Sequence, residues 1–205
     1  MAKTIKLVFS GGDSGGKTTA LNYSAKHLKE LGFTVLIIEE FATHFLKAGL
    51  SPSLLKDTAA FENTIFKCQL YEETIIFEIA DKLARQSEKN IIILIDRGLC
   101  GIKAFLNDDE FQLILQEHKL TMNDLLKRYD AVFHLVTTLD GAPEYYKKAH
   151  RIDWGREKIL KNEEESKNAW LGHPQFKIFP NIKDGKKIDF KEKLKTVFRA
   201  VCMHI

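Results

Sequence analysis

The chain has little of what marks secreted, membrane or nucleic-acid-binding proteins. Its three cysteines are an odd number without metal-ligand spacing, so they predict reduced thiols and exclude a zinc site. The longest apolar run, Ile91 to Ile95, is far too short to span a bilayer, and no signal peptide is visible. A net charge of +3 is too small to argue for a nucleic-acid partner. We therefore expect a soluble, cytoplasmic protein without a membrane span.

Internal repeats and low-complexity segments are absent as well. The 205 residues suit a single domain, 1–205, and a hydrophobic fraction of 44% is enough for a full core. Apolar runs alternate with helical patterns. The expected strands are 5–9, 33–38, 91–95, 131–136 and 177–182. The expected helices are 17–31, 54–87 in one or two pieces, 108–118, 121–129, 145–168 and 190–201. This alternation predicts a three-layer α/β fold, with a parallel sheet of about five strands and helices on both faces.

A phosphate-binding P-loop follows the first strand. Residues 11–18 read Gly-Gly-Asp-Ser-Gly-Gly-Lys-Thr and match the pattern G-x-x-x-x-G-K-[ST] between a strand and a helix. The glycines let backbone N–H groups converge on phosphate oxygens, and the helix N-terminus adds a favourable dipole. We expect Lys17 to reach the β- and γ-phosphates of a nucleoside triphosphate. The hydroxyl of Thr18 is expected to coordinate Mg²⁺.

Two further strands end in charged residues. The third ends in Asp96-Arg97-Gly98, which is the Walker B pattern of an apolar strand followed by a carboxylate that holds Mg²⁺ or its water. Arg97 is interpreted as a contact to a phosphate or a phosphoryl acceptor, or else as a surface residue or a partner of Asp96.

The second strand ends in Glu39-Glu40, at the edge that faces the acceptor in P-loop kinases. A carboxylate there can accept a proton from an acceptor hydroxyl. Side chains alternate along a strand, so only one of the two is expected to face the site. The alternative interpretation is a solvated acidic turn.

The segment 145–170 is a candidate lid. It is rich in charges of both signs, and Arg151 and Arg156 are its best candidates for closing over a transferring phosphate. The alternative is an exposed helix with i,i+4 ion pairs. The loop from Trp170 to Pro174 is interpreted as a packed anchor rather than a base contact, because one histidine is a weak functional sign.

Several of these motifs together resemble a known family. The run from Gly11 to Leu21, the tripeptide at 96–98 and the stretch 170–174 resemble small AAA-labelled ATP/GTP-binding P-loop proteins. That group includes the TRPL-translocation-defect GTP-binding proteins, and the chain is also similar to the ribosylnicotinamide kinase and thymidylate kinase-like group. Other matching positions are 40–43, Gln69, Glu73, 129–130, 134–135, 141–142 and Arg156. The resemblance covers about residues 3–195.

The resemblance implies a kinase-like P-loop core. The implied nucleotide-binding residues are Gly11, Gly12, Asp13, Ser14, Gly15, Gly16, Lys17, Thr18 and Thr19, with Asn181 near the base. Asp96 then supports the metal, while Glu40 and Arg97 face the acceptor. Arg156 belongs to the lid, and Gln69 reaches the base of the acceptor. Gly98 follows the dipeptide Asp96-Arg97, whereas the thymidylate kinases have an aromatic residue at that position.

The first functional hypothesis is a phosphotransferase that moves the γ-phosphate of ATP or GTP, with Mg²⁺, to a nucleoside- or nucleotide-type small molecule. Its expected catalytic residues are Lys17, Glu40, Asp96, Arg97 and Arg156, and its expected acceptor-binding residues are Gln69, Arg97 and Arg151. The sequence leaves open whether the protein forms a homodimer.

Two other functions compete with this one. A nucleotide-dependent regulatory switch would act through protein or phosphoinositide partners, for which the basic segment 183–195 could suit an anionic surface. A simple hydrolase would need a water-positioning residue, and we identify none. The chain has no Asn-Lys-x-Asp tetrapeptide, which argues against a conventional GTPase but leaves ATP and GTP both open.

Overall fold

Five parallel strands form the centre of the molecule in the computed structural model, which describes residues 2–146 and 155–205. Their order across the sheet is β2 (Thr34–Ile38), β3 (Ile91–Asp96), β1 (Thr4–Ser10), β4 (Ala131–Leu135) and β5 (Phe176–Phe179). Every neighbouring pair of these strands runs parallel. The predicted α/β class, with a five-stranded parallel sheet, is confirmed.

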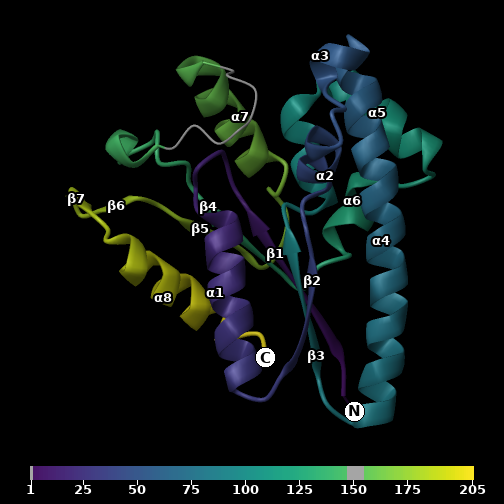
Figure 1. The fold of residues 1–205 in the computed structure, drawn as a ribbon, viewed down its shortest axis with the longest axis vertical. Coiled ribbons are helices and arrows are strands. Elements are labelled where there is room, and N and C mark those ends of the chain that lie inside the picture. Colours follow the sequence, from purple (N-terminus) through teal and green to yellow (C-terminus); the bar gives the residue numbers. More distant parts are fainter. Residues whose placement is uncertain (1, 147–154) are drawn as a thin grey trace.

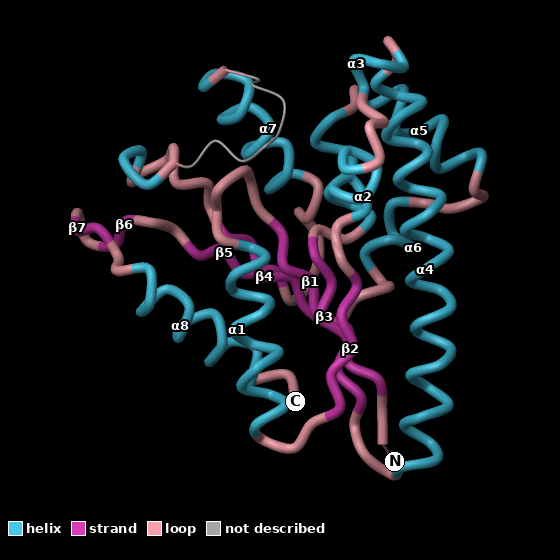
Figure 2. Tube along the Cα trace, in the orientation of Figure 1, coloured by secondary structure: helices cyan, strands magenta, loops and turns pink. Residues whose placement is uncertain are grey.

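Helices cover both faces of the sheet (Figures 1 and 2). One face carries α1 (Lys17–Glu30) and α8 (Phe190–Cys202), and the other carries the long helix α4 (Thr58–Ser87). The shorter described helices are α2 (Phe41–Lys47), α3 (Pro52–Leu55), α5 (Asp108–Glu117), α6 (Met122–Leu126), α7 (Arg156–Asn168) and the 3-10 turns η1 (Leu99–Phe105) and η2 (Pro143–Tyr145). No helix within the described residues combines the length and the apolarity needed to cross a membrane.

Strand β3 shows why this sheet is buried on both faces. Ile91, Ile93 and Ile95 pack with the α4 side of the core, while Ile92 and Leu94 pack with α1 and α8. All five side chains are at most 1% exposed. An unbroken apolar run of this kind is typical of a parallel strand between two helical layers.

The helix predicted over 54–87 is divided into two pieces. Lys56 adopts a left-handed conformation with φ of 54°, which ends α3. Asp57 then caps α4, because its carboxylate accepts a hydrogen bond of 2.9 Å from the N–H of Ala60. The break places α3 and the start of α4 across the top of the molecule in Figure 1, above the carboxyl end of the sheet.

Four described features, one of them η2, were not expected from the sequence. Helix α2 begins after Glu40 and η1 begins after Gly98, and neither residue makes a side-chain cap that would signal a helix start. The fourth is a two-stranded antiparallel hairpin, β6 (Ile182–Lys183) and β7 (Lys186–Lys187). The helix predicted from 145 begins, in the described chain, only at Arg156. Residues 147–154, including Arg151, lie outside the described residues.

Candidate functional site

The topology brings the ends of β1, β3 and β4 to one edge of the sheet. Phe9 on β1 pairs with Asp96 on β3, and Ser10 pairs with His134 on β4. The N–H of Arg97 donates to the carbonyl of Phe9 at 2.9 Å. Ligands of open α/β sheets bind at the carboxyl ends of the strands, where connections leave in opposite directions. The P-loop and the Asp96-Arg97 pair therefore lie side by side at that edge.

The glycines of the P-loop are required by its close approach to β4. Gly11 has φ of 136°, and a Cβ there would lie 2.0 Å from the carbonyl oxygen of Leu135. Gly16, with φ of 90°, precedes α1, whose first turn contains no acidic residue. The buried ammonium of Lys17 donates to the carbonyl of Gly12 at 2.9 Å. Burial lowers the pKa of Lys17, and the charge of Arg97 lowers it further. Within the described residues no carboxylate forms a salt bridge with this ammonium, so an arriving phosphate would supply a close anionic partner.

Thr18 and Asp96 form the part of the site that could hold a metal ion. The Thr18 hydroxyl donates to Asp96 Oδ2 at 2.7 Å, whereas the buried Asp96 Oδ1 has no hydrogen-bond partner among the described residues. Burial raises the pKa of this carboxyl, and Lys17 opposes that rise. No group of three or more His, Cys, Asp or Glu side chains in the described chain could hold a metal. One hydroxyl and one carboxylate fit Mg²⁺ that also takes oxygens from phosphate and water.

The same edge of the sheet also holds a buried ion pair. Arg97 Nη2 lies 2.5 Å from Glu40 Oε1, and the two side chains are 12% and 7% exposed. Glu40 Oε2 accepts a hydrogen bond of 3.0 Å from the Thr43 hydroxyl. Glu39 is exposed and lines, with Glu40, a pocket that also includes Thr18 and Asp96. Of the two carboxylates, Glu40 is the one that pairs with Arg97 beside the P-loop.

Arg97 is fixed by its backbone and by an aromatic ring as well. Its φ is 80°, a left-handed value that is uncommon outside glycine, and its guanidinium lies 4.8 Å from the centroid of the Phe105 ring. Burial by itself lowers the pKa of Arg97, but the carboxylates of Glu40 and Asp13 outweigh burial, so the pKa is raised. The residue is a permanent cation beside the P-loop.

A carboxylate from α7 connects the candidate lid to the P-loop. Glu163 is 2% exposed, and its Oε2 accepts hydrogen bonds from the N–H of Gly12 at 2.7 Å and of Thr137 at 3.1 Å. Its Oε1 lies 2.7 Å from His134 Nε2. Burial raises the pKa of Glu163, but the hydrogen bond and charge of His134 outweigh it and hold the pKa below its usual value.

A cavity of about 1,020 Å³ lies between α4, η1 and α7. Glu62 and Phe105 line it, and both also line a smaller pocket with Asp13, Glu40 and Arg97. These shared residues give a continuous lining from the P-loop to the cavity. The N-terminal turn of α7 closes another side through Arg156, which also donates to the carbonyl of Leu139 at 3.4 Å.

Gln69, for which the resemblance implies a contact to the acceptor base, is bonded within the core. It is 1% exposed, is absent from the lining of the large cavity and of the smaller pocket beside Arg97, and donates to Glu73 at 3.0 Å. Glu73 also accepts hydrogen bonds from Tyr129 and Arg128. The face of α4 that carries Gln69 is turned into the core, where polar side chains must satisfy one another.

Asn181 is likewise occupied within the protein. Its amide donates to the carbonyls of Thr137 and Asp140, both at 2.7 Å, and its Oδ1 accepts from Lys193 at 2.7 Å. With these bonds the side chain has little capacity left for a nucleotide base. Its direct effect is to hold the loop that follows β4 against the start of α8.

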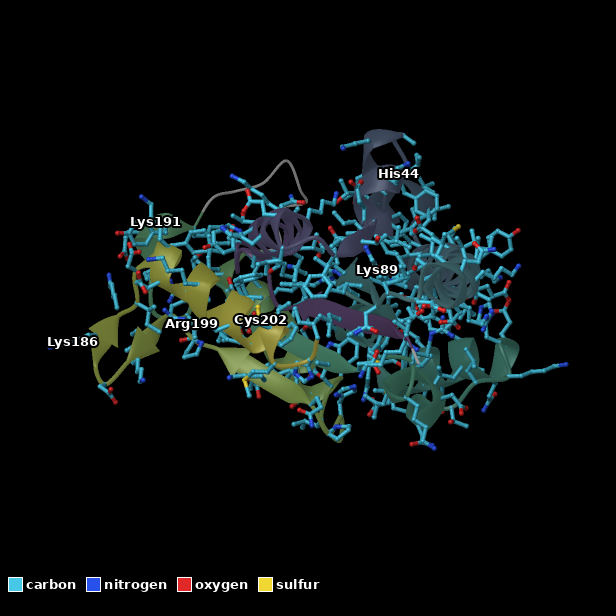
Figure 3. The ribbon with its side chains drawn as sticks, turned by 90° about the horizontal axis from the view of Figure 1, so that it is seen from below. His44, Lys89, Lys186, Lys191, Arg199 and Cys202 are labelled. Carbon is cyan, nitrogen blue, oxygen red and sulfur yellow. The ribbon has the colours of Figure 1, made fainter. Side chains whose placement is uncertain are left out.

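The basic segment 183–195 does not form a uniform cationic surface. Lys193 is 3% exposed, and burial lowers its pKa to about 8. Lys195 pairs with Glu192 at 2.6 Å. In Figure 3 Lys186 and Lys191 project from the side formed by the β6–β7 hairpin and α8. The alternation of buried, paired and projecting lysines gives little support to binding of an anionic surface.

The loop with Trp170 is the packed anchor that the sequence predicts. Trp170 is fully buried, with its ring edge-on to Tyr129 at 5.5 Å between centroids. His173 is 6% exposed, and its Nε2 lies 3.0 Å from the carbonyl of Tyr129. Trp170 also lies against Gly98, where a Cβ would come within 3.1 Å of the indole.

Two residues of the site were missed in the sequence. Glu62 had a usable signal, since it lies between Phe61 and Ile65 on the apolar side of a helix, where a lone carboxylate is out of place. Glu163 had no usable signal, because it begins a run of three glutamates. Only its tertiary contacts distinguish it from Glu164.

Comparison with known proteins agrees with this geometry. A family model described as an AAA domain matches residues 6–179, from β1 through the P-loop, the Asp96 strand and α7 to β5. No curated protein matches the chain. The matched region contains the P-loop, the Glu40–Arg97 pair, Asp96 and Glu163, whereas Asn181 and α8 lie beyond it. The chain therefore belongs to the AAA-domain family of P-loop nucleotide-binding proteins.

Proposed function

We propose that the protein is a phosphotransferase that moves the γ-phosphate of ATP or GTP to a hydroxyl group of a nucleoside- or nucleotide-type small molecule. One observation carries the proposal. The lining of a cavity large enough for such an acceptor is continuous, through Phe105 and Glu62, with the buried Glu40–Arg97 pair beside the P-loop. A hydrolase needs only a position for water, whereas this arrangement offers space for a second substrate.

Different residues are proposed to bind the phosphate donor and to face the phosphate acceptor. Lys17 and the N–H groups of the P-loop hold the β- and γ-phosphates. Mg²⁺ held by Thr18 and Asp96 would neutralise charge on the transferring group. Arg97 lies between the P-loop and the cavity, where it can neutralise charge that develops in the transition state. Arg156 and, outside the described residues, Arg151 are proposed to act from the lid.

Glu40 is proposed to receive the proton of the acceptor. The acceptor oxygen bonds to the γ-phosphorus, the bond from that phosphorus to the bridging oxygen breaks, and the hydroxyl proton passes to the Glu40 carboxylate. The products are a nucleoside diphosphate and a phosphomonoester. Arg97 and Thr43 hold the two oxygens of this carboxylate in place.

The test is transfer of labelled phosphate from ATP and from GTP, with Mg²⁺, to a panel of nucleosides and nucleotides. We expect a labelled product with wild type, a large loss with Glu40→Gln and little change with Glu39→Gln, its exposed neighbour. Nucleotide binding should survive both substitutions. Binding without transfer to any acceptor would overturn the phosphotransferase and favour a regulatory switch, while unchanged turnover in Glu40→Gln would remove Glu40 from the reaction.

A further inference from the structure

Glu62 is an unexpected residue to find in the wall of the acceptor cavity. It lies in the second turn of α4, next to the fully packed Phe61 and Ile65, and is 6% exposed. The described residues give it neither a hydrogen bond nor a salt bridge. It nevertheless lines both the large cavity and the small pocket that reaches Arg97. A buried polar group normally has a partner, so a carboxyl group aimed at open space indicates a ligand.

We propose that Glu62 selects the acceptor by hydrogen-bonding the edge of a planar nitrogen heterocycle that lies against Phe105. The relevant edge places an N–H or NH2 donor beside a ring-nitrogen or carbonyl acceptor, as nucleobases do. This inference rests on the proposed phosphotransfer, for which it names the acceptor class and a specificity-determining residue.

The protonation state of Glu62 suits such an edge. Burial raises its pKa to about 8, with Arg97 opposing the rise and Glu40 adding to it. At neutral pH the group is therefore mostly a neutral acid, which offers one O–H donor and one carbonyl acceptor side by side. An ionised carboxylate would offer acceptors only. The neutral acid can thus make two bonds to a heterocycle edge, as the side chain of glutamine can.

Phe105 provides the surface for the ring. It lies at the end of η1 and lines the same two pockets as Glu62, while one face of its ring is covered by the Arg97 guanidinium. Aromatic side chains bind heterocycles by stacking. Glu62 on α4 and Phe105 on η1 therefore offer an edge contact and a stacking contact within one cavity.

Other charged groups face this cavity and bear on its pH dependence. Besides Arg97, Glu40 and Asp13 at the P-loop end, Asp108 begins α5 on one side. Helix α7 contributes Arg156, Glu157, Lys158, Lys161 and Glu165 on the other side. These α7 residues carry three positive and two negative charges, and all but Glu165 are exposed, so solvent screens them. Glu62 is the group in this lining whose pKa is raised to near 8.

The test measures binding separately from turnover. Uridine and adenosine, each with a derivative methylated at the base edge (N3-methyluridine and N6,N6-dimethyladenosine), are titrated calorimetrically into protein loaded with Mg²⁺ and a non-hydrolysable ATP or GTP analogue. We expect at least one parent nucleoside to bind and its methylated derivative to bind at least about tenfold more weakly. Glu62→Gln should stay within about threefold of wild type and Glu62→Ala should lose at least about tenfold. Glu78→Gln, at an exposed position of the same helix, is the matched control.

A pH series adds a readout that a merely structural role would not give. Binding to wild type should weaken as the pH rises through about 8, whereas binding to Glu62→Gln should not follow that titration. Equal affinities of wild type and Glu62→Ala, or of parent and methylated nucleosides, would overturn the proposal. So would failure of every nucleoside to bind.

The outcomes also separate this inference from the proposed function. Phosphate transfer to an acceptor without a heterocycle, such as glycerol or inositol, would overturn the role of Glu62 and leave the phosphotransferase standing. Binding of a nucleoside that depends on Glu62, without any phosphorylated product under turnover conditions, would support the site and overturn the phosphotransfer.

Discussion

Lys17 is buried at the site with only the Gly12 carbonyl as its hydrogen-bond acceptor within the described residues. Charge-assisted hydrogen bonds to phosphate are stronger than a hydrogen bond to a neutral carbonyl. The ammonium of Lys17 therefore makes its strongest interactions only when a nucleotide is bound. We expect Lys17→Ala to weaken ATP and GTP binding at least about tenfold, measured by calorimetry. Lys29→Ala, an exposed change on the same helix, should have no effect. Retained affinity in Lys17→Ala would contradict the assignment of the P-loop.

Asp96 places one bonded and one unpartnered oxygen at the proposed metal position. Asp96→Asn keeps the size of the side chain and can still accept from Thr18, so the fold should survive. We expect the variant to lose turnover, with saturation moved to higher Mg²⁺ concentration, while its melting temperature changes little. Activity against Mg²⁺ concentration and thermal unfolding, recorded on one preparation, check both statements. An unfolded variant would point to a structural role.

Glu62 makes the stability of the protein depend on pH in a predictable direction. Its folded pKa is raised from 4.5 to about 8, so the folded state favours the protonated form. Its contribution is present in full below pH 4.5 and is lost as the pH rises towards 8. Each pKa unit corresponds to about 1.4 kcal/mol, so the loss amounts to a few kcal/mol. Denaturant unfolding at pH 5 and pH 8.5 should show a smaller loss in Glu62→Gln than in wild type; equal losses would contradict this.

At the scale of elements, one face of α4 is joined by a buried polar network to η1 and to the segment between α6 and β4. Glu73 is fully buried and accepts from Tyr129 at 3.0 Å and from Arg128 at 3.1 Å, while the Tyr129 hydroxyl accepts from the N–H of Leu99 at 3.0 Å. The network fixes the start of η1, and with it the position of Phe105. Buried polar contacts of this kind favour one arrangement of the elements that they join.

Removing the centre of that network should be costly. Glu73→Ala leaves the guanidinium of Arg128 without its carboxylate, which typically destabilises a protein by about 3 kcal/mol or more. The exposed change Glu78→Ala on the same helix should stay within about 0.5 kcal/mol of wild type. Urea unfolding of the three proteins measures the difference. Equal stabilities would show that α4 is held by its apolar contacts alone.

Helix α7 is the element whose contacts join the lid side to the P-loop. Glu163 bonds Gly12 and Thr137, and Ile159 is buried in the adjoining core. These contacts place the first turn of α7, with Arg156, at the rim of the acceptor cavity. Movement of the proposed lid would therefore be coupled through Glu163 to the backbone of the P-loop.

At the scale of the whole molecule, the site is assembled from segments far apart in the sequence, so a bound nucleotide should stabilise the entire fold. At a concentration about 100 times the dissociation constant, a ligand adds about 2.7 kcal/mol. For a chain of this length that corresponds to a rise in melting temperature of about 5–10 °C. Thermal scans with Mg²⁺ and ATP or GTP should show the rise in wild type and not in Lys17→Ala. Whichever nucleotide gives the larger rise at equal concentration binds more tightly, and an equal rise in Lys17→Ala would contradict the expectation.

Much of this protein was predictable from its sequence because the signals are local. The P-loop is a contiguous pattern, the apolar run before Asp96 marks a buried parallel strand, and helical spacing marks α1 and α8. Such signals depend on the chemistry of neighbouring residues, so they determine the fold class and the phosphate-binding loop without knowledge of the tertiary contacts. Elements without a capping signal, such as α2 and η1, were missed for the same reason.

The tertiary structure alone decided which polar side chains face the site. Gln69 and Glu62 lie two turns apart on one helix, yet the first is bonded inside the core and the second lines the cavity. Glu40 rather than Glu39 is turned to Arg97, and Glu163 rather than Glu164 reaches the P-loop. Each choice depends on which face of an element packs against residues distant in the chain. Local sequence therefore determined that this protein holds a phosphate, whereas long-range packing determined the surroundings that an acceptor would meet.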